Sequence, residues 1–370
     1  MSERQAAVRL HLTNVAGAGA IQLVKSLLPA LERSAVARIS EIHLPDRGEL
    51  ANYRALGPDV RPRRYRRRLP NAVSRALECT LLAARFDGST PLLVLGDIPL
   101  RCRGPQTVFV QTPLLAAPSS AHRLPERWKL AVARWLFRLN ARHAGAFIVQ
   151  TSVMKASLTA SYPEIADRIH VLAQPVPAWL IDAGLRRRGR HVALDAPLTL
   201  VYPAATYRHK NHRLLGDIDA ATAATWPVRR LTLTIAPDLS PAPALPWLSC
   251  CGFLPPQGML DLYRDVDALL FLSLDESFGF PLLEAMFVGI PVVCPDLPYA
   301  RAMCGDGAIY FDPTSTGSLQ HALETLHRRL ARGWWPDWSA ALAKFPADWD
   351  AVAAAMLRLA LAGTAADPLG

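Results

Sequence analysis

The chain has 370 residues, of which 51% are hydrophobic, and it carries 41 Lys and Arg against 31 Asp and Glu. This length accommodates two α/β domains of ordinary size, and no run of about 18 apolar residues predicts a membrane-spanning helix. The start of the chain lacks the basic-then-apolar pattern of a secretory signal, and the six cysteines lack the spacing of a zinc site or a disulfide framework. We therefore expect a cytoplasmic protein with reduced thiols.

The net charge of +10 is concentrated in the first half of the chain. Residues 1–190 hold 29 of the 41 basic residues and 13 of the 31 acidic residues. A basic half of this kind suits a negatively charged partner, such as membrane lipid, a phosphorylated lipid acceptor or nucleic acid. The alternative interpretation is a solvated basic face without a partner.

Short apolar segments, each followed by turn residues, predict the parallel strands of a first α/β domain. They are residues 7–13, 91–95, 107–110, 146–149 and 168–172. After the first of them, Gly17 and Gly19 precede an amphipathic helix predicted over residues 21–31. Two close glycines allow either the approach of a ligand to the backbone or a plain tight turn. Because position 22 is Gln, the G-x-G-x-x-G pattern is incomplete and no dinucleotide site is predicted.

Two basic segments of this half, residues 61–68 and 126–139, are candidates for contact with a membrane. On a helical wheel of the second segment, an apolar stripe lies beside a stripe of arginines. The apolar stripe consists of Trp128, Val132, Trp135 and Leu139. Aromatic next to basic side chains suits a bilayer interface, whereas a core-facing helix with a solvated edge is the alternative. No signature of a nucleic-acid-binding module accompanies these charges, so we expect no nucleic acid partner.

The arginine-rich residues 186–190 are interpreted as a polar linker, after which residues 198–201 open a second sheet. The loop after this strand carries Arg208, His209 and Lys210. A cation at this place can stabilise a phosphate that gains charge during a reaction, so we expect Lys210 to contact a diphosphate. The alternative is a solvated cluster of loop charges.

The most informative segment is residues 275–291, which reads DESFGFPLLEAMFVGIP. It lies between two apolar segments, residues 268–272 and 290–294, which predict short buried strands. Strand, turn, helix and strand form the parallel α/β unit in which ligands bind at the carboxyl ends of the strands. This segment is therefore the main candidate for a binding site.

The residues of this segment suit two kinds of chemical group. Gly279 and Pro281 predict a turn into a helix, because Pro fits the first helical position, and the free N–H groups of that first turn can bind phosphate. Glu276 stays on the loop and Glu284 falls about one turn into the helix, which gives two separated carboxylates for hydroxyl groups. A nucleotide sugar combines a diphosphate with hydroxyl groups in this way.

With its neighbours in order, this segment resembles the E-x7-E motif of retaining glycosyltransferases of the GT-B fold, in particular glycosyltransferase family 4. The resemblance is close over residues 198–313 and looser in the first half. It implies an α/β protein with two Rossmann-like domains that face one another across a cleft. We predict an acceptor-side domain over residues 1–180 and a nucleotide-sugar-binding domain over 191–345. The C-terminal helix, within residues 346–370, is expected to cross back to the first domain.

The resemblance also implies a reaction and roles for individual residues. Glu276 and Lys210 would be catalytic, with Glu276 holding the donor sugar, and Glu284 would bind the ribose. The further donor-binding candidates are Phe278, Gly279, Phe280, Pro281, Leu282, Arg208, His209, Gly17 and Gly19, and Gln111 is a candidate contact to the acceptor or the sugar. No cofactor or metal is expected, because the D-x-D pattern of Asp265 and Asp267 stands where related sequences carry an acid before a strand.

The implied reaction transfers a hexose, with mannosyl or rhamnosyl slightly favoured, from a nucleotide sugar to a lipid-linked saccharide. Such a step belongs to cell-surface polysaccharide synthesis, including lipopolysaccharide, and the protein would rest at the inner face of the cytoplasmic membrane. The departing phosphate oxygen would take the proton of the acceptor on the same face of the sugar, with retention.

Three positions depart from the family pattern and keep two other functions open. Ala205 stands where relatives have an Arg, Gln111 where many have a His, and Ala302 where a Glu is common. One alternative is a nucleotide-sugar epimerase or another GT-B enzyme such as a phosphorylase, since one fold supports several reactions. The other is a non-catalytic protein that binds sugar nucleotides or glycolipid.

Overall fold

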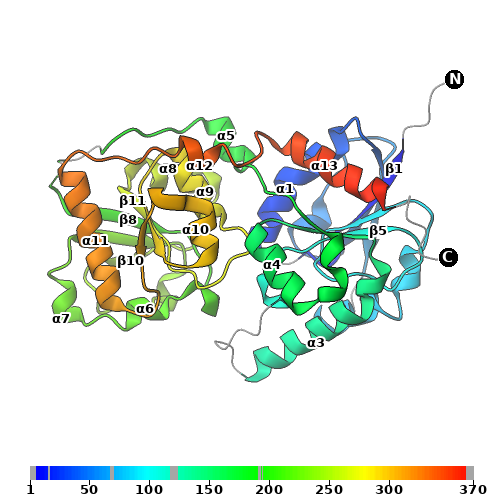
Figure 1. Cartoon of the computed structure of the whole chain (residues 1–370), viewed down its shortest axis with the longest axis horizontal. Helices are drawn as coiled ribbons and strands as arrows, with labels where there is room; N and C mark the ends of the chain where they lie inside the picture. The colour runs from blue at the N-terminus through cyan, green and yellow to red at the C-terminus, as the bar shows by residue number, and fades with distance from the viewer. Residues whose placement is uncertain are drawn as a thin grey trace. The chain divides into compact units, whose positions relative to one another are not determined.

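The computed structural model describes residues 6–15, 17–66, 71–116, 124–190, 193 and 195–363, and the chain divides into two compact units. Unit 1 comprises Met1–Pro175 and Pro346–Gly370, and unit 2 comprises Val176–Phe345. Each unit is built on its own parallel β-sheet (Figure 1).

The sheet of unit 1 has seven strands in the order β3-β2-β1-β4-β5-β6-β7, and all neighbouring strands are parallel. The strands are β1 (Ala7–His11), β2 (Arg38–Pro45), β3 (Arg61–Tyr65), β4 (Leu92–Val94), β5 (Gln106–Phe109), β6 (Ala146–Val149) and β7 (Ile169–Val171). The chain first builds outward from β1 to β3 and then returns to build from β4 to β7 on the other side. The order of the strands therefore reverses between β1 and β4.

Helices cover both faces of this sheet (Figure 1). The α-helices are α1 (Ala18–Arg33), α2 (Asn71–Cys79), α3 (Leu124–Asn140), α4 (Ser152–Ser161) and α13 (Trp349–Ala362). The 3-10 helices are η1 (Glu49–Asn52), η2 (Ala83–Phe86), η3 (Pro113–Leu115), η4 (Ala141–His143) and η5 (Pro163–Arg168). Helices α1 and α13 pack against one another, and α13 also contacts β1, β4, β5 and β6.

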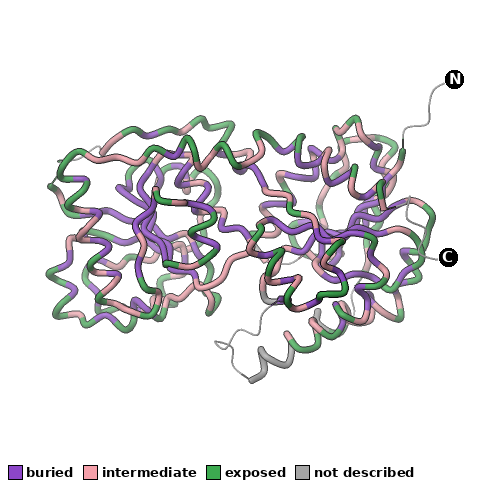
Figure 2. The backbone as a smooth tube through the Cα atoms, in the orientation of Figure 1, coloured by how far each residue is buried: buried purple, intermediate pink, exposed green. Residues whose placement is uncertain are grey.

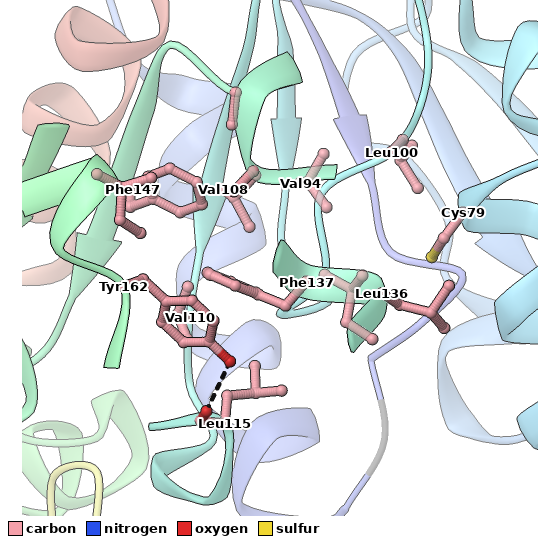
Figure 3. Close-up of a cluster of buried hydrophobic side chains, with 14 of the residues drawn as sticks. Cys79, Val94, Leu100, Val108, Val110, Leu115, Leu136, Phe137, Phe147 and Tyr162 are labelled. Carbon is pink, nitrogen blue, oxygen red and sulfur yellow. Dashed lines mark hydrogen bonds between the residues drawn. The ribbon is translucent and has the colours of Figure 1, made fainter. Parts of the chain in front are cut away.

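One core of unit 1 lies between the sheet and α3 (Figure 3). Phe137 of α3 packs against Phe147 and Tyr162, with ring centroids 5.4 Å and 4.7 Å away. The Tyr162 hydroxyl donates a hydrogen bond to the Leu115 carbonyl at 2.9 Å, which satisfies its polar atom inside the core. Val108 belongs to the same cluster. Its chain neighbour Thr107 donates from Oγ1 to the carbonyl of Leu359 on α13, because successive strand residues point to opposite faces.

The sheet of unit 2 has six parallel strands in the order β10-β9-β8-β11-β12-β13. They are β8 (Leu198–Tyr202), β9 (Val228–Leu233), β10 (Leu248–Cys250), β11 (Ala268–Leu270), β12 (Val292–Pro295) and β13 (Ile309–Phe311). Its α-helices are α5 (Ala178–Ala183), α6 (Arg213–Gly216), α7 (Ala220–Ala223), α8 (Pro256–Asp265), α9 (Phe280–Val288), α10 (Pro298–Cys304), α11 (Thr316–Ala331) and α12 (Ser339–Leu342). Its 3-10 helices are η6 (Arg208–Lys210), η7 (Pro237–Leu239) and η8 (Gly305–Gly307). In both units the central strands are buried (Figure 2).

The expected α/β class is confirmed, and the apolar segments named from the sequence correspond to β1, β4, β5, β6, β7, β8, β11 and β12. The apolar pattern does not identify β3, which coincides with most of the basic segment at residues 61–68. Its residues Arg61–Tyr65 form an exposed edge strand paired with β2, where Arg63 donates to Glu41 at 2.8 Å. The last two arginines of that segment, at positions 67 and 68, lie outside the described residues.

The interpretation of residues 186–190 as a polar linker is wrong. Arg187 is buried and donates hydrogen bonds to the carbonyls of Tyr263 and Val266. Arg190 forms a two-pronged ion pair with Asp267, with N–O distances of 2.9 Å and 2.8 Å. These arginines anchor the start of unit 2, because a buried guanidinium requires partners for its donors.

Helix α3 presents the predicted apolar stripe to solvent rather than to the core. Val132 is 41% exposed and Trp135 is 62% exposed, whereas Leu136 and Phe137 are buried. The side chain of Trp128 lies outside the described residues. None of the helices that the structure describes is both long and apolar enough to cross a membrane.

Candidate active site

The loops that follow β8 and β11 meet at one edge of the unit 2 sheet, because these parallel strands are neighbours. The Leu274 amide donates to the carbonyl of His209 at 2.7 Å, and Ser273 Oγ donates to the same carbonyl at 3.2 Å. From β8, the Tyr202 hydroxyl donates to the carbonyl of Lys210 at 2.7 Å. Two hydrogen bonds thus fix the short helix η6 against the loop that carries Glu276, and a third fixes it against β8.

Lys210 and Glu276, the two residues expected to be catalytic, contact one another directly. The Nζ atom of Lys210 donates to Oε1 of Glu276, and the two side chains are only 15% and 12% exposed. Lys210 Nζ also lies 5.8 Å from the centre of the Phe271 ring. Partial burial strengthens the attraction between the two charges, and the same burial would strengthen the attraction of Lys210 to a bound anion.

His212, next to this pair, supplies no positive charge near neutral pH. Burial, together with the charge of Lys210, lowers its pKa to about 4. Its ring packs edge-on against Tyr202 at 5.4 Å. Lys210 is therefore the cation of this buried corner, whereas Arg208 is exposed at the surface of η6.

Helix α9 begins beside Glu276 without a side-chain cap. Gly279 occupies its N-cap position with φ 89° and ψ 57°, a left-handed conformation that favours glycine, and Pro281 stands in the first turn. Phe278 is buried against Phe280 and Phe345, with ring centroids 5.0 Å and 5.8 Å away. The aromatic packing fixes the start of the helix. No side chain caps this end, although the Leu282 amide donates to the Gly279 carbonyl at 2.9 Å.

Glu284 lies one turn further along α9, on the side that faces α8. The hydroxyl of Tyr263 donates to its Oε2 atom at 2.8 Å. Burial raises the pKa of Glu284 to about 7, although the hydrogen bond from Tyr263 acts in the opposite direction. Its carboxyl group therefore changes charge near neutral pH, and a hydroxyl group that donates a hydrogen bond to it would favour the ionised form.

Two features of this corner were not predicted from the sequence. The hydroxyl of Tyr299 on α10 donates to the carbonyl of Ser273, and this hydrogen bond ties the loop after β11 to α10. Asn211 adopts a left-handed conformation with φ 55°, and its Nδ2 donates to the carbonyl of Pro313 at 3.0 Å. The Asn that follows Lys210 in the sequence could have indicated this turn, because Asn tolerates the left-handed conformation better than most residues.

The remaining candidates, Gly17, Gly19 and Gln111, belong to unit 1. Gly17 has φ 92° at the N-cap of α1, and a Cβ atom added to Gly19 would meet nothing within 4 Å. The Gln111 amide N–H donates to Asp97 Oδ1 at 2.6 Å, and its side-chain Nε2 donates to the Leu95 carbonyl at 2.9 Å. These three residues are not part of the unit 2 corner.

Asp267 of the D-x-D pattern is engaged inside the protein. Besides the two contacts from Arg190, its Oδ2 accepts a hydrogen bond from the Thr199 amide at 2.8 Å. In the part of the chain that the structure describes, no group of three or more His, Cys, Asp or Glu side chains could hold a metal ion. The position of Asp267 between β8 and the start of β11 gives it a structural role.

Comparison with protein families finds a match to part of the chain. Residues 248–329, a range that includes Glu276, α9 and Glu284, match the model described as "Glycosyl transferases group 1". Two curated relatives match a similar length of chain. O-antigen chain mannosyltransferase B of Escherichia coli is 32% identical over 81 residues, which is 22% of this chain and 21% of the relative. O-antigen chain mannosyltransferase RfbU of Salmonella typhimurium is 36% identical over 67 residues, 18% of this chain and 19% of the relative. The match thus spans about a fifth of each relative.

Comparison with solved structures covers nearly the whole chain. Sucrose-phosphate synthase from Thermosynechococcus elongatus aligns with a TM-score of 0.59 at 14% identity, over 92% of this chain and 97% of that one. HepE from Anabaena, solved in complex with UDP-glucose, aligns with a TM-score of 0.56 at 13% identity, over 97% of this chain and 98% of that one. At such low identity the likeness shows the fold, which is the α/β GT-B fold with two Rossmann-like sheets.

Proposed function

We propose that this protein is a retaining glycosyltransferase that moves a hexose from a nucleotide sugar to a lipid-linked saccharide in cell-surface polysaccharide synthesis. The observation that carries the proposal is the contact of Lys210 with Glu276 beside the uncapped start of α9. The match to the group 1 glycosyltransferase model over this segment supports it. The two relatives named as O-antigen mannosyltransferases favour a mannosyl donor.

The donor diphosphate would bind between Lys210 and the first turn of α9. A diphosphate carries more negative charge than one carboxylate, so it would compete with Glu276 for the ammonium group. The N–H groups and the dipole at the start of α9 add a second source of positive potential. Together they would stabilise the charge that develops on the leaving phosphate as the glycosidic bond breaks.

The two glutamates would then take different hydroxyl groups. Displaced from Lys210, Glu276 is free to accept a hydrogen bond from the donor sugar. Glu284 would accept hydrogen bonds from the ribose, which favour its ionised form over the protonated one. None of the described side chains at this corner is placed as a nucleophile, so we assign the acceptor proton to the departing phosphate oxygen, on the face of the sugar where the new bond forms.

The acceptor would be presented by an anionic membrane surface at the cytoplasmic side. Unit 1 contains 26 of the 41 basic residues and 15 of the 31 acidic residues of the chain. On α3 the exposed Val132 and Trp135 lie next to the basic residues of the same helix. This arrangement suits the interface of a bilayer that carries negative lipids.

A non-catalytic protein that binds sugar nucleotides is the second candidate function. It is favoured by Ala205, Gln111 and the exposed Ala302, which stand where relatives carry polar donor contacts. The two functions differ in turnover rather than in binding.

The test combines thermal unfolding with a transfer assay. UDP-, GDP-, dTDP- and ADP-linked hexoses are screened for a rise in the melting temperature, and the best donor is then incubated with octyl glycoside acceptors. We expect one donor to stabilise the protein and to be consumed. A donor that binds but is neither transferred nor slowly hydrolysed would favour the non-catalytic function, and a protein stabilised by none would contradict the proposal.

A further inference from the structure

The sheet of unit 1 has its own candidate site at the carboxyl ends of β1 and β4, where the strand order reverses. Ligands of open α/β sheets bind outside the carboxyl ends of the strands at such a point. The two loops that leave these strands are in direct contact, because a Cβ atom on Gly96 would lie 2.6 Å from the Cβ of Asn14. Only glycine at position 96 permits this close packing.

Asp97, which follows this glycine, has a strained backbone. Its φ of 67° places it with Asn211 as the two non-glycine residues with positive φ in the described part of the chain. Such conformations persist where the surroundings impose them, often at functional sites. Here the Asp97 Oδ1 atom accepts hydrogen bonds from the amides of Gln111 at 2.6 Å and Thr112 at 3.1 Å. These bonds tie the loop after β4 to the loop after β5.

Asp97 is partly exposed, and its second carboxylate oxygen, Oδ2, receives no hydrogen bond from any residue that the structure describes. The neighbouring Gln111 uses its Nε2 for the Leu95 carbonyl, and its Oε1 likewise has no partner among the described residues. At the carboxyl ends of β4 and β5, two acceptor oxygens with fixed positions therefore lack a partner among the described residues.

The chemistry of this pair selects its ligand. Burial raises the pKa of Asp97, and the two amide hydrogen bonds and the charge of Arg75 on α2 offset this only in part. A carboxylate repels phosphate and binds O–H donors through short, charge-assisted hydrogen bonds. The ligand that fits is a neutral polyol, which in this setting is a saccharide.

We infer that Asp97, together with Gln111, binds hydroxyl groups of the acceptor saccharide. The inference rests on the proposed glycosyltransferase function and adds to it an acceptor-binding residue in unit 1. The residues suited to the donor diphosphate lie in unit 2, around Lys210 and α9. A hydroxyl of the donor sugar offers the same chemistry, and the experiment separates the two sources.

Asp97→Asn is the sharpest variant, because Asn tolerates the left-handed conformation and can still accept from both loop amides. Only the Oδ2 atom changes, because a charged acceptor oxygen is replaced by an amide donor. Asp87→Asn is the matched control, since Asp87 of the same unit accepts a hydrogen bond from the Arg103 amide at 2.6 Å at an exposed position. Both variants are compared with the wild-type chain for melting temperature, nucleoside diphosphate affinity, nucleotide-sugar affinity and transfer to octyl glycosides.

We expect Asp97→Asn to lower kcat/KM for the octyl glycoside by about 10- to 100-fold, as for loss of one charged hydrogen bond. Its melting temperature and its affinities for the nucleoside diphosphate and the nucleotide sugar should match those of Asp87→Asn. A weaker affinity for the nucleotide sugar alone would assign the site to the donor sugar and overturn the acceptor assignment. Kinetics equal to those of the control would overturn the site altogether.

Failure of the proposed function would look different. In that case the wild-type protein itself binds no nucleotide sugar and transfers no hexose, whatever stands at position 97. An active wild-type enzyme with an unaffected Asp97→Asn variant contradicts only the acceptor site.

Discussion

In each unit, the charge of the side chains at the carboxyl ends of the strands differs from the net charge of the whole unit. Unit 1 is basic overall, yet carboxylates lie beside its strand ends: Glu78 of α2 contacts His11 of β1 at 3.1 Å, and Asp97 accepts hydrogen bonds from the loop after β5. Unit 2 has nearly balanced charge, yet its strand ends present Lys210 and the uncapped start of α9. The sign of a binding site is thus set by a few residues at strand ends, whereas net charge describes the outer surface. On this basis unit 2 suits phosphate and unit 1 suits hydroxyl groups.

The largest effect is expected from removal of the unit 2 cation. Lys210→Ala should weaken nucleoside diphosphate binding by about 10- to 100-fold, the cost of one charge-assisted contact, and lower turnover at least as much. Lys344→Ala, an exposed lysine of the same unit, is the control. Unchanged affinity of the Lys210 variant in calorimetry would place the phosphate elsewhere and remove the contrast between the units.

The two glutamates of unit 2 should separate by ligand. Glu284→Gln should weaken binding of the bare nucleoside diphosphate by about tenfold, because one hydrogen bond to the ribose loses its charge. Glu276→Gln should leave that affinity unchanged or improve it, since Lys210 loses a competing carboxylate, and should lower turnover. Equal losses of nucleotide affinity in both variants would contradict this division of roles.

The pKa of Glu284 makes a prediction for stability without ligand. Its pKa is raised from 4.5 to about 7 in the folded protein, so folding disfavours its ionised form. This cost is absent below pH 4.5, develops as the unfolded chain ionises, and is complete above pH 7. Since Glu284 as a whole is only half-buried, we discount the full shift and expect Glu284→Gln to stabilise the protein by about 1–2 kcal/mol at pH 8. Denaturation at pH 4.5 should show little difference between the variant and the wild type, and a pH-independent difference would contradict the raised pKa.

The smallest effect concerns the outer surface of unit 1. Trp135→Ala should reduce sedimentation with anionic vesicles by a few-fold at low salt, since binding to the interface scales with the apolar area buried there. Leu81→Ala, which changes a 78% exposed side chain of the same unit, is the control. Added salt should release the wild-type protein, because exposed charges are screened beyond about 8–10 Å. Absence of sedimentation with anionic vesicles at physiological salt would favour a merely solvated basic face.

The sequence predicted those parts of the fold and site whose signal is local. Buried strands such as β11 and β12 are short apolar runs, and Gly279 with Pro281 marks the start of α9 within one residue. The edge strand β3 was not predicted, because its exposed residues carry no apolar pattern and its pairing with β2 depends on distant residues. Periodicity reports burial, so it misses strands that are not buried.

Contacts between distant segments could not be predicted in the same way. Arg187 and Arg190 read as a polar linker because their partners, Val266 and Asp267, lie more than seventy positions away. The contact of Lys210 with Glu276 likewise depends on β8 and β11 being neighbours in the sheet. Asp97 gave no signal at all, since a strained backbone at a strand end is visible only in three dimensions.

The most direct test of the central claim, that Lys210 and the start of α9 bind a diphosphate without a metal ion, is calorimetry of the wild-type chain in EDTA. The titrants are the nucleoside diphosphate of the preferred donor and the corresponding nucleoside. We predict that the diphosphate binds at least tenfold more tightly than the nucleoside, on the order of one charge-assisted contact, and that magnesium adds nothing. Equal affinity for both ligands, or binding that appears only after magnesium is added, would contradict the account.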